Sequence, residues 1–431
     1  MSIDNLNLTE IPSVKLGDVC KFQGGNGFRE EIQGAKSGDY PFIKVSDMEI
    51  LANKKYILDA NNWLDQKTYL KESIKLFPKD SVVFAKVGAA LLLNRRRIIT
   101  RETAIDNNMM AAIPENIDPE FLFYLLSKID FADFVQSGAV PSVNQTQISN
   151  IEIKLPCSSE QKQIAAILST IDRAIAQTEA IIAKQQRIKT GLMQDLLTKG
   201  IDEHGNIRSE VTHEFKDSAI GRIPVEWEVE TCSAMCREII VGIVIRPAQY
   251  YKPSGVPILR SANVKENRID FSDLVYMSEK DHNILRKTCL YEGDLVTVRT
   301  GYPGTTAVIP PELDGSNCVD IVISRPDRRR IRPNYLALWI NSDFGKKQVL
   351  EGQGGLAQQH FNVGEVRKLL VKVPKIDEQS KIENLLVQSN DSLKYQQHLQ
   401  KLHQLKNGLM QDLLTGKIRV TELLKEREPA I

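Results

Sequence analysis

The eight residues GLMQDLLT occur twice in this 431-residue chain, at positions 191–198 and again at 408–415. Each copy ends a polar, helix-forming segment, and weaker matches precede both copies in the same order. PFIKVSD at 41–47 aligns with PILRSAN at 257–263, and IDPEFL at 117–122 aligns with IRPNYL at 331–336. An internal repeat of this kind indicates a duplicated architecture. The sequence therefore predicts two copies of a variable module, each followed by a nearly invariant helix.

The repeat divides the chain into four predicted segments: a first module at 1–156, a helix at 157–200, a linker with the second module at 201–374, and a second helix with a tail at 375–431. Within the modules, short β-rich runs alternate with turn signals, and a helix lies near the end of each. The fold class predicted from these patterns is α+β, with two similar mixed α/β domains separated by two long helices.

The helices are predicted at 158–197 and 376–414, and about 38 residues at ~1.5 Å each give rods of roughly 55 Å. Each has one apolar seam with heptad-like steps, which indicates that it needs a partner helix. The other copy is the nearest candidate, and two unrelated helices packed on their own domains are the alternative. Glycine inside a helix is costly, so Gly191 and Gly408 indicate close helix approach, a shared bend, or tolerance near a helix end. The predicted packing residues are Ile164, Leu168, Ile171, Ile175, Gly191, Leu192, Ile382, Leu386, Leu402, Gly408 and Leu409.

No signature of catalysis or metal binding stands out in the sequence. The phosphate-binding GxxxxGK[ST] loop, HExxH and GxSxG are absent. Cys232 and Cys236 lack a second ligand pair with zinc-finger spacing, so no metal site is predicted. The absent motifs lead us to expect a non-catalytic chain. Six scattered cysteines, no basic and apolar leader and no long apolar run lead us to expect a cytoplasmic protein.

The charge pattern permits nucleic-acid binding without requiring it. A net charge of +1 argues against a solitary high-affinity DNA binder. The arginine clusters in each module either contact phosphates or are solvated loops. Basic residues at matching positions of the two modules could reach phosphate or guanine. Amide-rich loops could read adenine or cap a turn. These DNA-binding candidates are Lys44, Lys86, Arg95, Arg96, Arg97, Ser142, Asn144, Gln145, Arg260, Arg299, Arg328, Arg329, Arg330, Gln358, Gln359 and Asn362.

Several junctions resemble a known family. Pro156, then Ser159-Glu160-Gln161, leads into a helix ending GLMQDLLTKGIDEHGNIRSE, which resembles the conserved regions of the specificity (S) subunits of type I restriction–modification enzymes. IGRIPVEW at 220–227 and VKLGDV at 14–19 resemble the starts of the two target-recognition domains of that family. The second start departs from the first, since WEVETCS lacks the Leu-Gly-Asp. The resemblance spans almost the whole chain and is weaker within the modules.

The resemblance implies a pseudo-twofold molecule whose two helices pack as an antiparallel coiled coil along double-stranded DNA. Each domain would read half of a split target, and the helices would set the gap. Two modification subunits would bring the adenine methyltransferase and S-adenosylmethionine, and restriction subunits would add ATP- and Mg²⁺-dependent cleavage. This chain itself would hold no cofactor. Two other interpretations remain open: a stand-alone bivalent DNA-binding regulator, and a non-DNA adaptor with two protein-binding modules.

Overall fold

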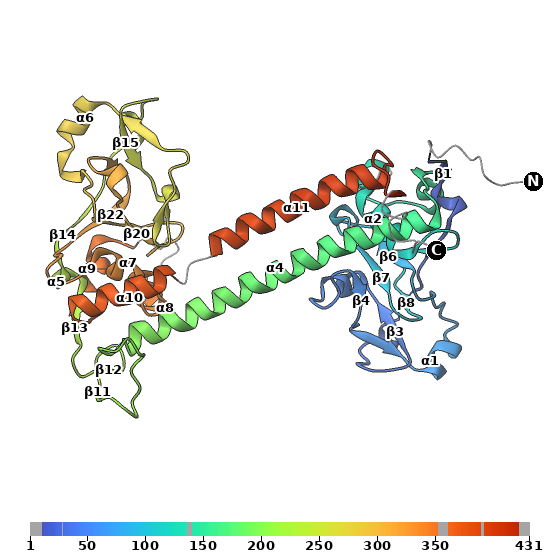
Figure 1. Ribbon diagram of the computed structural model, residues 1–431, viewed down its shortest axis with the longest axis horizontal. Coiled ribbons are helices and arrows are strands. Elements are labelled where there is room, and N and C mark those ends of the chain that lie inside the picture. The colour runs from blue at the N-terminus through green and yellow to red at the C-terminus, as the bar shows by residue number, and fades with distance from the viewer. Residues whose placement is uncertain (1–10, 28, 136–139, 352–360, 389–391, 422–431) are drawn as a thin grey trace, which may run out of the picture. The chain divides into compact units, whose positions relative to one another are not determined.

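The computed structural model describes residues 11–27, 29–135, 140–351, 361–388 and 392–421. The chain divides into two compact units (Figure 1). Unit 1 contains residues 1–180 and 396–431, and unit 2 contains residues 181–395. Each unit therefore combines one predicted module with parts of both predicted helices.

Unit 1 is built on two small sheets. The first has the strand order β2 (Cys20–Gly24), β9 (Met109–Pro114), β6 (Val82–Ala85), β7 (Arg96–Ile99), β4 (Tyr56–Ile57). The second has the order β5 (Asn62–Leu64), β3 (Tyr40–Ile43), β8 (Ala104–Ile105), and β3 and β8 run parallel. A third pair joins β1 (Ser13–Lys15) to β10 (Glu152–Lys154). The helices of this module are α1 (Gln66–Lys71), α2 (Pro119–Lys128) and α3 (Gln145–Ser149).

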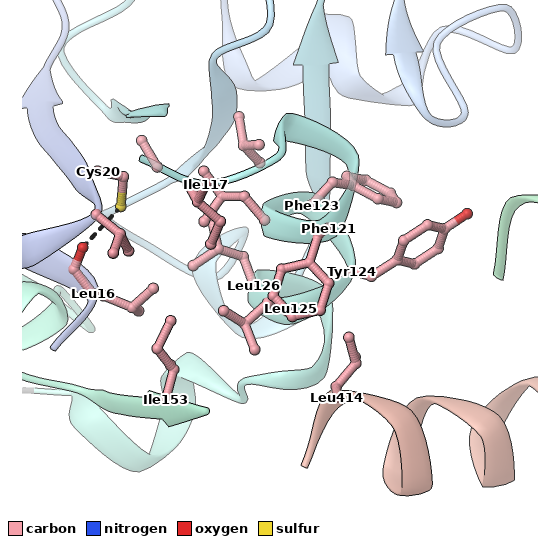
Figure 2. Close-up of a cluster of buried hydrophobic side chains, with 14 of the residues drawn as sticks. Leu16, Cys20, Ile117, Phe121, Phe123, Tyr124, Leu125, Leu126, Ile153 and Leu414 are labelled. Atoms are coloured by element: carbon pink, nitrogen blue, oxygen red, sulfur yellow. Dashed lines mark hydrogen bonds between the residues drawn. The ribbon is translucent and has the colours of Figure 1, made fainter. Parts of the chain in front are cut away.

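Helix α2 forms where the sequence provides both a start signal and an apolar run. The Asp118 carboxylate accepts hydrogen bonds from the first free backbone amides, and Pro119 fits the first turn because it has no amide hydrogen to satisfy. Six consecutive residues of α2, 121–126, are buried. Figure 2 shows Phe121 and Leu125 in this core, with Leu414 reaching it from near the other end of the chain.

Unit 2 repeats the same plan. Its main sheet has the order β14 (Cys236–Val241), β22 (Ile321–Pro326), β19 (Leu295–Val298), β20 (Thr306–Val308), and its second sheet the order β18 (Val275–Met277), β15 (Val256–Leu259), β21 (Asn317–Cys318). Three strand pairs accompany them: β11 (Phe215–Lys216) with β12 (Ile223–Pro224), β13 (Glu228–Thr231) with β23 (Leu370–Val373), and β16 (Val264–Lys265) with β17 (Arg268–Ile269). The helices are α5 (Cys232–Met235), α6 (Glu279–Ile284), α7 (Pro333–Asn341), α8 (Asp343–Glu351) and α9 (Val363–Lys368).

The two modules are therefore similar, which confirms the predicted α+β class. In each, a mainly antiparallel sheet, with one parallel edge pair (β4 with β7) in unit 1, lies next to a smaller sheet that contains one parallel pair, β3 with β8 and β15 with β21.

The predicted first helix is present as α4 (Ser158–Thr198), which is 41 residues long. The second is present as α10 (Ile376–Gln388) and α11 (Ser392–Leu414), and residues 389–391 between them lie outside the described residues. Within unit 1, α4 and α11 run in opposite directions, because Asp172 pairs with Lys406 at 2.6 Å while Glu160, earlier in α4, pairs with the later Arg419. A coiled coil over the whole length of the helices stays a prediction.

The end of each repeated helix packs into the core of the module from the other copy. Leu196 and Leu197 of α4 are buried in unit 2, and Leu413 and Leu414 of α11 are buried in unit 1. Of the predicted packing residues, five are buried: Ile164, Leu168, Ile175, Ile382 and Leu386. Four are partly exposed: Ile171, Leu192, Leu402 and Leu409.

The close-approach interpretation of the two helical glycines is wrong within the described residues. Gly191 and Gly408 are exposed, and a Cβ added to either would have no heavy atom within 4 Å. Different glycines matter for the helix ends. Gly200 and Gly416 follow α4 and α11 with φ values of +64° and +73°, a left-handed conformation that terminates helices.

Candidate nucleic-acid interface

In unit 1, the loops after β2, β3 and β8 meet at one edge of the sheets. The amide of Asp106 donates to the Ile43 carbonyl at 2.9 Å, and the amide of Asn26 donates to the Ile105 carbonyl at 2.8 Å. Lys86, directly after β6, joins this edge through the Val143 amide, which donates to its carbonyl at 3.0 Å. We call this set of loops, residues 24–27, 44, 86–94, 106–108 and 141–144, the loop edge of unit 1.

The same bonds recur in unit 2. The Val319 amide donates to the Leu259 carbonyl at 3.0 Å, and the Ile243 amide donates to the Cys318 carbonyl at 2.9 Å. The Phe361 amide donates to the Arg299 carbonyl at 3.0 Å. The loop edge of unit 2 therefore comprises residues 242–246, 260, 299–305, 319–320 and 361–362.

This equivalence brings predicted cations together. Lys44 and Lys86 lie at the loop edge of unit 1, and Arg260 and Arg299 occupy the corresponding places in unit 2. A Cβ on Gly24 would lie 3.0 Å from the Lys86 ammonium nitrogen, so the glycine leaves room for the lysine side chain. These four residues stay predicted DNA contacts.

Arg96 needs a correction. Its side chain is 2% exposed and lies over the Phe131 ring, 3.9 Å from the ring centroid, so it is not free to contact a phosphate. One guanidinium nitrogen donates to the Asn94 side chain at 3.0 Å, and burial lowers the pKa of Arg96 to about 9. Two of the donors of Arg97 are taken by the Met48 and Asn53 carbonyls. Arg95 is more accessible and pairs with Glu49. The first arginine cluster is thus partly structural.

The second cluster lies at the other end of its sheet. Strand β22 starts at the loop edge and ends at Pro326, so Arg328, Arg329 and Arg330 follow its far end. Arg329 is 88% exposed and pairs with Asp327 at 3.0 Å. Arg328 donates to the Glu292 carbonyl, and Arg330 donates to the Ala234 carbonyl at 2.8 Å. The structure does not bring this cluster to the loop edge.

The predicted DNA-binding residues with amide or hydroxyl side chains have several different structural roles. The side-chain oxygens of Asn144 and Asn362 accept backbone amides of Gln147 and Glu365 at 2.9 and 3.2 Å, so both residues cap short helices. Ser142 forms an isolated β-bridge with Val87, and Gln145 begins α3. Gln358 and Gln359 lie outside the described residues.

Sequence reasoning missed the apolar side chains at the loop edges. Tyr302 is 84% exposed in a turn between Gly301 and Gly304, which have φ values of +85° and +84°. Ile245 is 74% exposed, and Leu92 and Leu93 are also exposed in the matching loops. The Gly-Tyr-Pro-Gly sequence was the available signal, because paired glycines and a proline favour a sharply exposed tip.

Sequence reasoning also missed the charged pairs that join the two repeats. Glu378 is in α10, and its carboxylate accepts hydrogen bonds from Arg208 (Oε2 to Nη2, 3.2 Å), the Ile201 amide (2.9 Å) and the Trp227 indole (3.1 Å). In unit 1, Glu160 accepts two bonds from Arg419 at 2.7 and 2.8 Å. Burial raises the pKa of Glu160, but the bonds from Arg419 outweigh it and the net shift is downward. We call the pairs Glu160–Arg419 and Glu378–Arg208 the clamps.

Beside each clamp, a glutamine ties the long helix to its module. The Gln161 side-chain oxygen accepts the Asp118 amide at 2.8 Å, and the Gln379 oxygen accepts the Arg332 amide at the same distance. Both amides lie at the start of a buried module helix, α2 or α7. The repeated Glu-Gln dipeptide therefore fixes where each module attaches.

The described residues contain no cluster of three or more His, Cys, Asp or Glu that could hold a metal ion. Among the helices that the structure describes, none combines the length and the apolar character of a membrane span.

Comparison with known proteins shows similarity to one family. A family model for the type I restriction modification DNA specificity domain matches residues 10–186. The type I restriction enzyme MjaVIII specificity subunit of Methanocaldococcus jannaschii is 25% identical over 439 residues, covering 95% of this chain and 93% of the relative. The EcoBI specificity subunit of Escherichia coli is 19% identical over 386 residues, covering 86% and 77%.

Two solved structures share the fold. The type I restriction–modification S subunit from M. genitalium has a TM-score of 0.56 at 12% identity, covering 95% of this chain and 98% of that one. A chain from a study of assembly and conformational transition of the type I system also has a TM-score of 0.56, at 16% identity, covering 95% and 100%. In sequence over almost its whole length, and in fold, the chain is similar to the specificity subunits of type I restriction–modification systems.

Proposed function

We propose that the chain reads a two-part target in duplex DNA, with the loop edge of unit 1 on one half-site and that of unit 2 on the other. The observation that carries this proposal is the repetition of cations at equivalent places, Lys44 with Arg260 and Lys86 with Arg299. Long cationic side chains at a convergence of loops suit contacts with phosphates and guanine edges. The helices that connect the modules would set the unread gap between the half-sites.

The remaining functions would come from partner subunits. Two modification subunits would supply S-adenosylmethionine and methylate adenine, and restriction subunits would supply ATP- and Mg²⁺-dependent cleavage. The chain's own task is then to position these partners in the cytoplasm without catalysis. Its near-neutral net charge supports this division, because partners would provide part of the phosphate neutralisation.

Methylation mapping tests the proposal. Cells that carry the chain with its modification partner should show methylated adenines in a motif of two parts separated by a fixed gap. Exchange of residues 1–156 for another first module should change one half of that motif and leave the other intact. A single uninterrupted motif, or a change in both halves, would contradict one module per half-site. Absence of salt-dependent DNA binding by the assembled complex would favour the protein adaptor instead.

A further inference from the structure

The two loop edges place different cations at one equivalent position. Lys86 follows β6 and Arg299 follows β19, and each carbonyl accepts an amide from the loop before the last strand, that of Val143 or Phe361, at 3.0 Å. The strands before them are also in register, because Ala85 pairs with Met109 and Val298 pairs with Ile321.

The turn that lies next to this cation also differs between the two units. In unit 1 the turn contains Asp106, Asn107 and Asn108; the Asp106 carboxylate accepts the Asn108 amide at 2.7 Å, and the Asn108 carbonyl accepts the Lys86 amide at 2.9 Å. In unit 2 the turn is one residue shorter and contains Asp320, whose carboxylate pairs with the Arg299 guanidinium. The carboxylate of the unit 2 turn therefore pairs with the arginine, whereas the carboxylate of the unit 1 turn bonds within its own turn.

This difference has a physical meaning. A lysine ammonium is a compact charge that donates in any direction, whereas a guanidinium is a planar fork whose direction matters. The Asp320 side chain binds one nitrogen of the fork and fixes its plane. Among the described residues, the Nε atom of Arg299 is buried and has no hydrogen-bond partner, so a contact with a base would come from the outer guanidinium nitrogens.

The carboxylate also affects which acceptor fits. Next to Asp320, the positive charge of Arg299 is largely compensated, so its attraction to a phosphate is weak. A neutral pair of acceptors forms better hydrogen bonds with a guanidinium whose plane is fixed. Guanine presents such a pair, O6 and N7, in the major groove.

We propose that Arg299 reads a guanine in the half-site of the second module, and that Asp320 is a positioning residue that holds the guanidinium for this contact. The proposal rests on the function proposed above. It follows that the first module, where the equivalent cation is Lys86 and the Asp106 carboxylate accepts the Asn108 amide of its own turn, contacts its half-site less directionally at the equivalent place.

The experiment compares Asp320→Asn, Arg299→Lys and Arg299→Ala in the complete complex with its modification partner. Asparagine suits position 320 because the residue has a φ of +51°, which asparagine tolerates. Asp273→Asn is the matched control, since Asp273 is another exposed aspartate of unit 2 with positive φ (+54°). Methylation rates are measured on targets that differ at each base pair of each half-site, at two salt concentrations.

We expect Asp320→Asn and Arg299→Lys to reduce discrimination at one G·C pair of the second half-site by about 5- to 100-fold. Discrimination in the first half-site should not change, and Asp273→Asn should behave as the unaltered chain. Thermal unfolding of each variant checks the fold, and the two conservative variants decide the matter if Arg299→Ala does not fold.

Two results would overturn the inference while leaving the proposed function in place. Equal weakening on all sequences with a smaller salt dependence would make Arg299 a phosphate contact, and unchanged discrimination would make the pair structural. If the unaltered complex methylates no two-part motif, the proposed function itself fails.

Discussion

The carboxylate of Glu160, near the start of α4, is held by the guanidinium of Arg419, which follows α11. Glu378 and Arg208 form the same pair in unit 2 with the order of the repeats reversed. In each clamp, the glutamate starts the helix of one repeat and the arginine follows the helix of the other. The repeats therefore complete each other's modules, as the buried leucines at the helix ends also do.

The Glu378 clamp should contribute strongly to stability. Glu378→Ala removes the partner of the buried Arg208 and also leaves the Trp227 indole and the Ile201 amide without their acceptor. Breaking a buried pair of this kind costs roughly 3–5 kcal/mol. Urea unfolding measures the loss. The control is Glu179→Ala in the exposed pair Lys54–Glu179, which should cost less than about 1 kcal/mol. Equal effects for the two variants would show that the clamp is unimportant.

Lys372 should make unit 2 more stable at alkaline pH. Its side chain is 1% exposed, and burial lowers its pKa to about 8 from the usual 10.5. The unfolded chain therefore binds more protons than the folded chain between pH 8 and 10.5, so the lysine's contribution to stability rises with pH across this window. Thermal unfolding from pH 7 to 10.5 should show that rise, and Lys372→Met should remove it. Unchanged pH dependence in the variant would assign the effect to other groups.

Lys86 and Arg329 should differ in their effect on DNA binding. Lys86→Ala should weaken binding of the assembled complex and reduce the slope of log affinity against log salt by about 1, as expected for one lost phosphate contact. Arg329→Ala should change neither, although Arg329 is more exposed, because it lies beyond the far end of β22. Titrations at several salt concentrations measure both. An equal loss for Arg329→Ala would extend the DNA-binding surface to that end of the sheet.

Gly191 and Gly408 should tolerate alanine. Both lie inside helices with open space around the Cβ position, so each substitution should stabilise the chain by about 0.5–1 kcal/mol through helix propensity. Chemical unfolding of the isolated chain measures this gain. If methylation by the assembled complex nevertheless falls, a modification subunit packs against these glycines. If the isolated chain is destabilised, the glycines have a role within the chain itself.

The sequence was sufficient for the architecture because the repeat is nearly identical in the helices. The seam of α4 could be recognised from its spacing, and the starts of both modules from their resemblance to a known family. The clamps were harder to find, since Glu160 and Arg419 are far apart in the chain and neither belongs to a helical pattern that pairs them. Only the fold shows that the second repeat returns to the first module.

The candidate interface was predicted less well, because adjacency in sequence does not give the direction of a side chain. Arg95, Arg96 and Arg97 form one cluster in the sequence, but the alternation of β7 buries Arg96 against Phe131. Conversely, Lys44 and Lys86 are far apart in the sequence, but the parallel pairing of β3 with β8 and the pairing of β6 with β9 bring both to the loop edge of unit 1. Tyr302 carried no charge and was passed over.

The clamps of this protein use the same few residues in both units, whereas the two loop edges differ. Genetic recombination between the two repeated helix segments, or between relatives that share them, would exchange a whole reading module without disturbing a single clamp. Such a chain can acquire new targets by shuffling, in one step, and does not have to rebuild its scaffold each time.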